Sequence, residues 1–170
     1  MILRDSDPVK LRSATAADIA SIMDLERASP TAAHWTEAQY RQAVQPGQDY
    51  APRLVFVVKA SPDSGEGVGC SLECDLLGFL VARPVVPEWE LENIVVAPAA
   101  RRNGLGRQLV EALLSTAQNT KSESVFLEVR ESNVAARNLY QKMGFEQTGR
   151  SKSYYADPIE DAILYRRKVK

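Results

Sequence analysis

Length, composition and charge already limit what this chain can be. It has 170 residues, against a usual ~100–200 per domain, so we expect one domain over residues 1–170, with its core at about 9–169. Its 21 Lys and Arg against 22 Asp and Glu give a net charge of -1. The chain therefore has no overall positive field to attract nucleic acid or an anionic membrane surface. Hydrophobic residues at 45% exclude the composition of a disordered chain.

Apolar runs and cysteines narrow the class further. No run approaches the ~18–20 apolar residues of a membrane span, and the amino-terminal segment is charged where a signal peptide is apolar, which predicts a cytoplasmic location. The only cysteines, Cys70 and Cys74, have the spacing of neither a zinc site nor a disulfide framework, so we expect free thiols. We expect no metal, no nucleic-acid partner and no membrane partner. The residues do not determine the oligomeric state, and a monomer is the expectation.

The first third of the chain predicts a strand followed by two helices. Residues 9–13 have the pattern of a short strand. Thr15 with Asp18, and Thr36 with Gln39, have the spacing of two capping boxes, each at the start of a helical pattern. Neither helix extends far before glycine or proline ends it.

Three strands are predicted next. Residues 54–59 are β-branched and apolar, which is typical of a buried strand. Residues 60–71 are rich in Gly and Ser and predict an exposed loop. The strands expected at residues 76–83 and 88–96 are joined by a connection too short for a crossover helix, so they form an antiparallel hairpin.

The second half predicts helices alternating with strands. A helix of about four turns begins near Gly104, and a strand follows at residues 124–130. Ser132 or Asn133 caps the next helix, whose apolar stripe we place at Ala135, Leu139 and Met143. Two strands, at residues 145–153 and 162–169, close the chain. The order βααβββαβαββ predicts a mixed α/β fold with helices packed on one mixed sheet.

A loop between a strand and a helix has the features of a phosphate cradle. The first N–H groups of a helix have no intrahelical partner and carry partial positive charge, so an anion is stabilised there. Gly104 and Gly106 permit close backbone approach, and Arg101, Arg102 and Arg107 add local charge. Taken alone, such glycines can simply cap a helix and such arginines can simply be solvated.

The spacing of this loop carries a resemblance to a known family. Arg101-x-x-Gly104-x-Gly106 after a strand resembles the coenzyme A pyrophosphate loop of the GNAT acetyltransferases. It lacks the Gly-Lys pair of a P-loop and the third glycine of a dinucleotide fingerprint. Asn103 stands where the family usually has a basic or polar residue. The resemblance assigns cofactor binding to the whole loop: Arg101, Arg102, Asn103, Gly104, Leu105, Gly106 and Arg107.

The resemblance extends to both sides of the loop. Four further segments are similar to the RimI-type branch, the bacterial protein N-terminal alanine acetyltransferases. These segments are residues 90–94, 126–133, 138–145 and 154–162. About residues 9–169 can be aligned with the pattern of that branch. The leader before Val9 and a long loop at 61–74 depart from it. The resemblance implies the GNAT fold, acetyl-CoA as cosubstrate and a protein N-terminus as acceptor, with the N-terminal alanine of a ribosomal protein as the expected one.

Two residues stand out for acid–base chemistry. Glu128 is expected on the polar side of an otherwise apolar strand, where a carboxylate needs a partner or a role, and a pair with Arg130 would be one explanation. Tyr140 comes one position beyond the predicted apolar stripe, and a packed aromatic would explain it. Asn133 and Tyr140 are seven residues apart, so they share one helix face about 10 Å apart.

The resemblance assigns roles to these positions. It makes Glu128 the general base, Tyr140 the general acid and Asn133 a contact of the pantetheine portion. It places the acetyl and pantetheine end against the backbone of Ile94, Val95 and Val96, and the acceptor against Glu92, Asn93 and Tyr155.

Two other functions stay open at this point. A GNAT enzyme could instead acetylate a lysine side chain or a small-molecule amine. A non-catalytic coenzyme A-binding module is the second alternative, although binding alone would require neither Glu128 nor Tyr140.

Overall fold

The computed structural model describes residues 9–45, 53–60 and 76–169. The expected loop beyond Ala60 and both cysteines, Cys70 and Cys74, lie outside these described residues, and Ala60 itself ends a strand. The predicted order βααβββαβαββ is confirmed. The strands are β1 Val9–Ser13, β2 Leu54–Ala60, β3 Leu76–Val85, β4 Glu88–Val96, β5 Ser124–Arg130, β6 Glu146–Ala156 and β7 Ile159–Lys168. The α-helices are α1 Ile19–Arg27, α2 Glu37–Val44, α3 Leu105–Asn119 and α4 Val134–Lys142.

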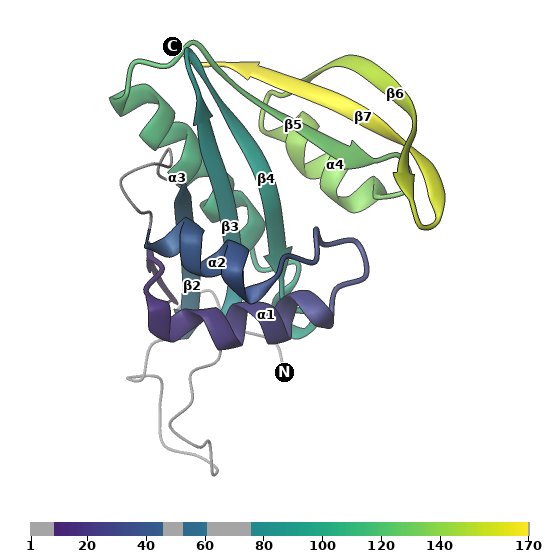
Figure 1. Cartoon of the computed structure of the whole chain (residues 1–170). Helices are drawn as coiled ribbons and strands as arrows, with labels where there is room; N and C mark the ends of the chain where they lie inside the picture. Colours follow the sequence, from purple (N-terminus) through teal and green to yellow (C-terminus); the bar gives the residue numbers. More distant parts are fainter. Residues whose placement is uncertain (1–8, 46–52, 61–75, 170) are drawn as a thin grey trace.

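The strands form one seven-stranded sheet in the order β1-β2-β3-β4-β5-β7-β6 (Figure 1). The predicted hairpin of β3 and β4 is antiparallel. β4 and β5 are parallel. The crossover connection through α3 returns the chain to the end of the sheet where β4 began, so both strands run in the same direction. The mixed sheet expected from the sequence is therefore confirmed, with its single parallel pair at the centre of the strand order.

The helices cover both faces of the sheet and so create two apolar cores. α1 and α2 lie on one face, while α3 and α4 lie behind it in Figure 1. Ile22, Tyr40 and Phe79 are fully buried on the first face. Leu109 and Leu113 of α3 are fully buried on the second. A sheet covered on both faces explains why the central strands are so apolar.

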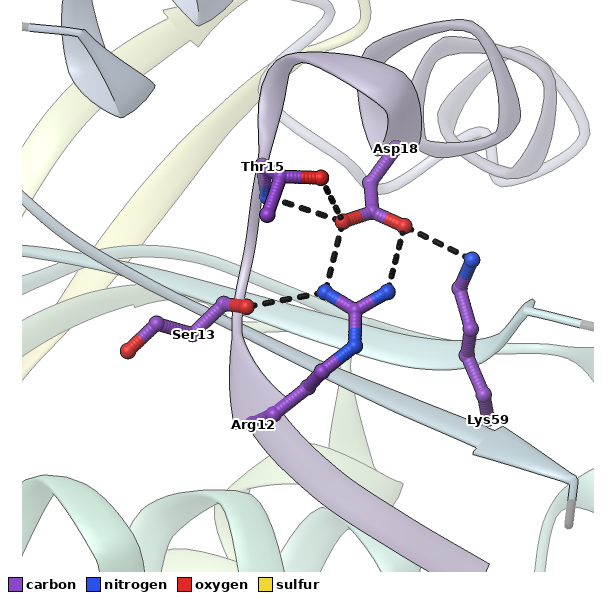
Figure 2. A network of polar contacts seen from close by, with 5 residues as sticks. All are labelled: Arg12, Ser13, Thr15, Asp18 and Lys59. Atoms are coloured by element: carbon purple, nitrogen blue, oxygen red, sulfur yellow. Dashed lines mark hydrogen bonds and ion pairs between the residues drawn. The ribbon is translucent and has the colours of Figure 1, made fainter.

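The start of α1 is fixed by a buried carboxylate, Asp18, which is 1% exposed. The predicted capping box is present, because the backbone N–H of Thr15 donates to Asp18 Oδ2 at 2.8 Å. Arg12 of β1 adds two hydrogen bonds, of 2.7 and 2.9 Å, and Lys59 of β2 lies 2.7 Å from Oδ1 (Figure 2). A 3-10 turn, Ala16–Asp18, precedes α1. One side chain thus joins the first helix to two strands.

The buried face of α4 differs from the prediction. Of the predicted stripe, Met143 is 9% exposed and Leu139 packs against the core, whereas Ala135 is exposed; Tyr140, predicted one position beyond it, is 3% exposed. The predicted stripe was therefore wrong only at Ala135, and the buried face also includes Tyr140, because its ring packs against the rings of Phe145 and Tyr165. Asn133 is the N-cap, as one of the two predicted residues.

Candidate active site

β4 and β5 separate from each other within the sheet. They pair only between residues 88–91 of β4 and 124–127 of β5, and Figure 1 shows them diverging beyond that point. The backbone of residues 92–96 is therefore not paired with β5. Such an open strand edge offers N–H and C=O groups to an extended ligand. This edge contains Ile94, Val95 and Val96. The family resemblance assigns the acetyl and pantetheine end of acetyl-CoA to the backbone of these residues.

A β-bulge in β4 coincides with the separation. The register with β3 moves from Val81 opposite Asn93 to Ala82 opposite Leu91, so Glu92 is the additional residue. Because side chains alternate along a strand, one extra residue reverses which face each later residue occupies. Leu91 accordingly lies in the core beneath α3, whereas Val95 lies in the core beneath α1 and α2.

A cavity of about 480 Å³ occupies the space between the diverging strands. It brings together both acid–base candidates, Glu128 from β5 and Tyr140 from α4, with Asn133 at the start of α4. The other walls come from the segment between α1 and α2, from β4, and from Tyr154 and Tyr155 of β6. Residues from five separate segments therefore converge on one site.

Glu128 lies half-buried on the predicted side of β5. The phenol of Tyr154 lines the same cavity, and the nearby carboxylate of Glu128, together with burial, raises the pKa of Tyr154 to about 12. Arg130, the partner that the sequence left open for Glu128, instead pairs with Glu160 at 3.3 Å and stacks over the ring of Tyr155 at 4.0 Å. The structure thus brings to the cavity of Glu128 a tyrosine that the sequence did not suggest as its neighbour.

Tyr140 is a buried phenol at the wall of the cavity. Its ring lies 5.7 Å from that of Phe145 and 6.2 Å from that of Tyr165. Burial raises the pKa of Tyr140 above its ordinary value, because ionisation in an apolar environment is unfavourable. The phenol therefore stays protonated at neutral pH, which is the state a proton donor requires.

Asn133 has a structural role as well as a place at the cavity. Its side chain accepts a hydrogen bond of 3.2 Å from the backbone N–H of Ala136 and so caps α4. The cap uses Oδ1, which leaves the Nδ2 group as the donor that can reach a ligand.

The loop before α3 has the backbone geometry of an anion cradle. Gly104 has φ +78, a backbone conformation that favours glycine. A Cβ at this position would meet nothing within 4 Å, so the space beside the Gly104 backbone is open. A Cβ at Gly106 would lie 3.2 Å from Leu139 Cδ2 and 3.8 Å from Val96 Cγ2. Gly106 thus lets α3 approach α4 and β4 closely. The residues present fit a pyrophosphate held by the first N–H groups of α3.

Several side chains of this loop already have partners within the protein, which the sequence did not suggest. Arg101 Nε donates to the carbonyl of Val96 at 3.1 Å, and Arg107 pairs with Glu111 at 2.7 Å. Asn103 Nδ2 donates to the carbonyl of Ala100 at 3.3 Å. Leu105 is buried in the core, so only its backbone can contribute to anion binding. Arg102 has φ +66, a left-handed backbone conformation.

The proposed acceptor residues already have protein partners. Glu92 forms two hydrogen bonds with Arg53, of 2.7 and 3.1 Å. Asn93 is buried, and its Nδ2 donates to Glu26 Oε1 at 2.7 Å and to the hydroxyl of Tyr40 at 3.3 Å. Both lie at the cavity wall, where their side chains hold the segments around it.

Sequence reasoning missed several residues of the cavity wall. His34 and Trp35 lie there, between α1 and α2, and Trp35 is held by its backbone N–H, which donates to the buried Glu26 at 3.0 Å. A helical stripe containing one glutamate, Glu26, was the available signal, since a buried carboxylate needs donors.

A second cavity, of about 650 Å³, lies between α3 and α4. It contains neither Glu128 nor Tyr140, so we place the chemistry in the smaller cavity, where both occur. Within residues 9–45, 53–60 and 76–169, no group of three or more His, Cys, Asp or Glu could hold a metal ion. In the same described part of the chain, no helix has the length and apolar character to span a bilayer.

Curated relatives resemble the chain over about half its length. The ribosomal protein bS18-alanine N-acetyltransferase of Escherichia coli strain K12 is 38% identical over 91 residues. That match covers 52% of this chain and 62% of the relative, so the chain spans less than two thirds of the length of the curated relatives it matches.

Solved structures resemble the chain over nearly all of it. The ribosomal-protein-S18-alanine N-acetyltransferase from Escherichia coli has a TM-score of 0.73 and 26% identity, covering 96% of this chain and 95% of that one. Arabidopsis thaliana NAA60 in complex with acetyl-CoA has a TM-score of 0.81 at 16% identity, covering 95% and 99% of the two chains, and shows the fold alone. The model of the acetyltransferase (GNAT) family matches residues 19–145. This chain therefore belongs to the GNAT acetyltransferase family, in agreement with the resemblance of its Arg101–Arg107 loop.

Proposed function

We propose that this chain, as one catalytic domain, transfers an acetyl group from acetyl-CoA to the free α-amine of a protein N-terminus by direct attack in a ternary complex. The observation that supports it most is the single cavity between β4 and β5 that contains both Glu128 and Tyr140. The open edge of β4 begins in the wall of this cavity and continues to Val96, and a Cβ at Gly106 of the glycine loop would lie 3.8 Å from Val96 Cγ2. This arrangement supports an acid and a base in the cavity and a cofactor that follows β4 toward the start of α3.

The chemistry divides between the two side chains. Acetyl-CoA supplies an activated thioester. Glu128, directly or through a water molecule, accepts the proton that the amine loses as its nitrogen bonds to the acetyl carbon. Tyr140 donates its proton to the departing thiolate as the carbon–sulfur bond breaks. A backbone N–H of residues 94–96 polarises the acetyl carbonyl. Tyr140 suits this role because a phenol with pKa ~10 or above is protonated whenever a thiol with pKa ~8.5 needs a proton.

The cofactor is held mainly by backbone groups. The N–H groups at the start of α3 receive the pyrophosphate, with Arg102 beside them, and Asn133 Nδ2 donates to the pantetheine portion. Gly104 and Gly106 keep this path clear of side chains, as the open space at Gly104 supports.

The acceptor is the finer part of the proposal. The relatives named for ribosomal protein bS18 support a ribosomal-protein N-terminus beginning with Ala, with Glu92, Asn93 and Tyr155 around it. Base catalysis by a carboxylate also suits an α-amine, whose pKa of ~7.7–8.0 is far below that of a lysine at ~10.4. A small closed pocket would reject larger first residues by steric clash.

Mass-resolved acetylation of matched peptides tests the proposal. A peptide beginning with Ala and containing one lysine is compared with the same peptide beginning with Leu or Trp, and with its N-blocked form. We expect the Ala peptide to be acetylated fastest, at the α-amine, and the blocked peptide to stay unmodified. Comparable acetylation of the lysine in the blocked peptide would replace this proposal with a lysine or small-amine acetyltransferase. No acetylation of any free amine would favour a coenzyme A-binding module.

A further inference from the structure

A large bulge in β6 stands opposite one residue of β7. Ser151 pairs with Ala162, and the next paired residues are Tyr155 and Glu160. Residues 152–154, which we call the β6 bulge, therefore face Asp161 alone. Ser153, at the centre of the bulge, has φ +50. Such a left-handed conformation is unfavourable for a residue other than glycine, so surrounding contacts must hold it.

Asp161 supplies those contacts. Its Oδ1 accepts a hydrogen bond of 2.8 Å from the backbone N–H of Ser153, and its Oδ2 accepts one of 2.6 Å from Arg150 Nε. Arg150 in turn donates to Glu131 at 2.8 Å, in the segment between β5 and α4. These bonds also lower the pKa of Asp161, first through Ser153 and then through Arg150. The β6 bulge is thus attached to its partner strand and to the far end of β5.

The β6 bulge ends at Tyr154, which lines the same cavity as Glu128 and whose pKa is raised by that carboxylate. Tyr154 is 52% exposed, so burial contributes little to holding its ring. The ring lies edge-on to Tyr155, with centroids 5.1 Å apart and planes at 82°. The backbone conformation of the bulge is therefore what directs the Tyr154 hydroxyl toward Glu128.

A parallel set of contacts fixes the neighbouring tyrosine. Arg130 stacks over Tyr155 and pairs with Glu160, whose Oε1 accepts a hydrogen bond from the backbone N–H of Ser132. Glu160 and Asp161, adjacent on β7, thus each stabilise one of two adjacent tyrosines on β6. This arrangement gives a structural reason for the Glu160–Asp161 pair, which the proposed chemistry does not use.

We propose that Asp161 is a positioning residue that fixes the β6 bulge, so that the Tyr154 hydroxyl holds one oxygen of Glu128 and leaves the other facing the acceptor amine. The inference rests on the proposed function, since that function supplies the amine. A carboxylate with one oxygen held has fewer orientations to lose when the amine binds, and small errors in such orientation reduce turnover strongly. Tyr154 and Asp161 then act as one unit through Glu128.

A double-mutant cycle tests this unit. Tyr154→Phe removes only the hydroxyl, and Asp161→Ala removes the acceptor of the Ser153 N–H. We expect each to lower kcat on the Ala peptide by about ten- to hundredfold with the KM for acetyl-CoA unchanged. The double variant should lose no more than the larger single loss. Losses that multiply in the double variant would overturn the inference, because the two residues would then act separately.

Two control variants separate positioning from general damage to the fold. Ser153→Gly keeps the N–H donor and suits φ +50, so its kcat should stay within about twofold. Asp24→Asn breaks an exposed ion pair with Arg27 on α1, whose side chains are 68% and 67% exposed, and should change nothing. Loss of activity in Ser153→Gly as large as in Asp161→Ala would contradict the role of the bulge conformation.

A spectroscopic measurement needs no turnover. In protein labelled with ¹³C at tyrosine Cζ, the Tyr154 resonance is identified by its disappearance in Tyr154→Phe. Glu128→Gln and Asp161→Ala should both displace that resonance, and Ser153→Gly should not. A Tyr154 resonance unmoved by Asp161→Ala would overturn the inference even if acetylation proceeds. Absence of acetylation with the expected displacements would instead count against the proposed function while leaving the Asp161–Tyr154–Glu128 arrangement in place.

Discussion

Replacing Asp18 with Asn should weaken the fold substantially without touching the active site. Asp18 is 1% exposed and interacts with Arg12 and Lys59, whose side chains are 32% and 17% exposed. Asparagine keeps the shape but presents an amide donor to these cations. Breaking a buried ion pair costs about 3–5 kcal/mol. Because both cations are partly exposed, we expect the free energy of unfolding to fall by about 3 kcal/mol, the lower end of that range. For a chain of this size that corresponds to a melting temperature lower by about 6–12 °C.

The effect of Asp18→Asn should depend on pH. Burial alone would raise the pKa of Asp18, but hydrogen bonds from Arg12, Lys59 and Thr15 outweigh it and leave the pKa well below its ordinary value. A carboxyl with a lowered pKa in the folded state stabilises the fold above its unfolded pKa of ~3.9, and this stabilisation is lost as pH falls further. The difference between the original chain and the variant should therefore shrink from pH 7 to pH 3.

Urea unfolding followed by circular dichroism at pH 7, 5 and 3 measures this difference. Asp24→Asn, at the exposed pair with Arg27, is the matched control and should change the free energy of unfolding by at most about 1 kcal/mol. A difference for Asp18→Asn below about 1 kcal/mol at pH 7, or one equally large at pH 3, would refute the reasoning. Acetyl-CoA affinity should be unchanged, since Asp18 does not line the cavity.

Three further predictions concern the active site. Tyr140→Phe should lower kcat by about 10²–10⁴ with little change in acetyl-CoA affinity, measured by steady-state kinetics and calorimetry; a change below threefold would remove Tyr140 as the acid. Glu128→Gln should lose most activity at low pH and recover roughly sixtyfold between pH 6 and pH 9, as an amine of pKa ~7.8 becomes unprotonated; a pH-independent loss would mean that Glu128 only positions substrate. Gly106→Val should weaken acetyl-CoA binding by at least about tenfold in calorimetry, and also lower the melting temperature, because its side chain would press on Leu139; unaltered affinity in a folded variant would contradict the assigned pyrophosphate loop.

The sequence alone determined the order of elements and the position of the glycine loop proposed to bind the cofactor. Hydrophobic period, capping boxes and glycines are local signals, so strands such as β4 and β5 were predicted with the observed bounds. The Arg101–Arg107 segment was recognisable because anion binding by a helix start needs glycines and an N-terminus within a few residues. Glu128 was found by the same local logic, as a carboxylate on an apolar strand.

Only the tertiary structure decided which groups meet. The buried side of α4, with Tyr140 on it, depends on rings of Phe145 and Tyr165 that lie outside the helix. The place of Tyr154 in the cavity of Glu128 depends on a bulge whose three residues face Asp161. Neither is encoded in a local period, because the first arises from ring contacts made outside the helix and the second from a register shift between β6 and β7. The chemistry-bearing residues could be named from the sequence, whereas their partners followed from the packing of the sheet.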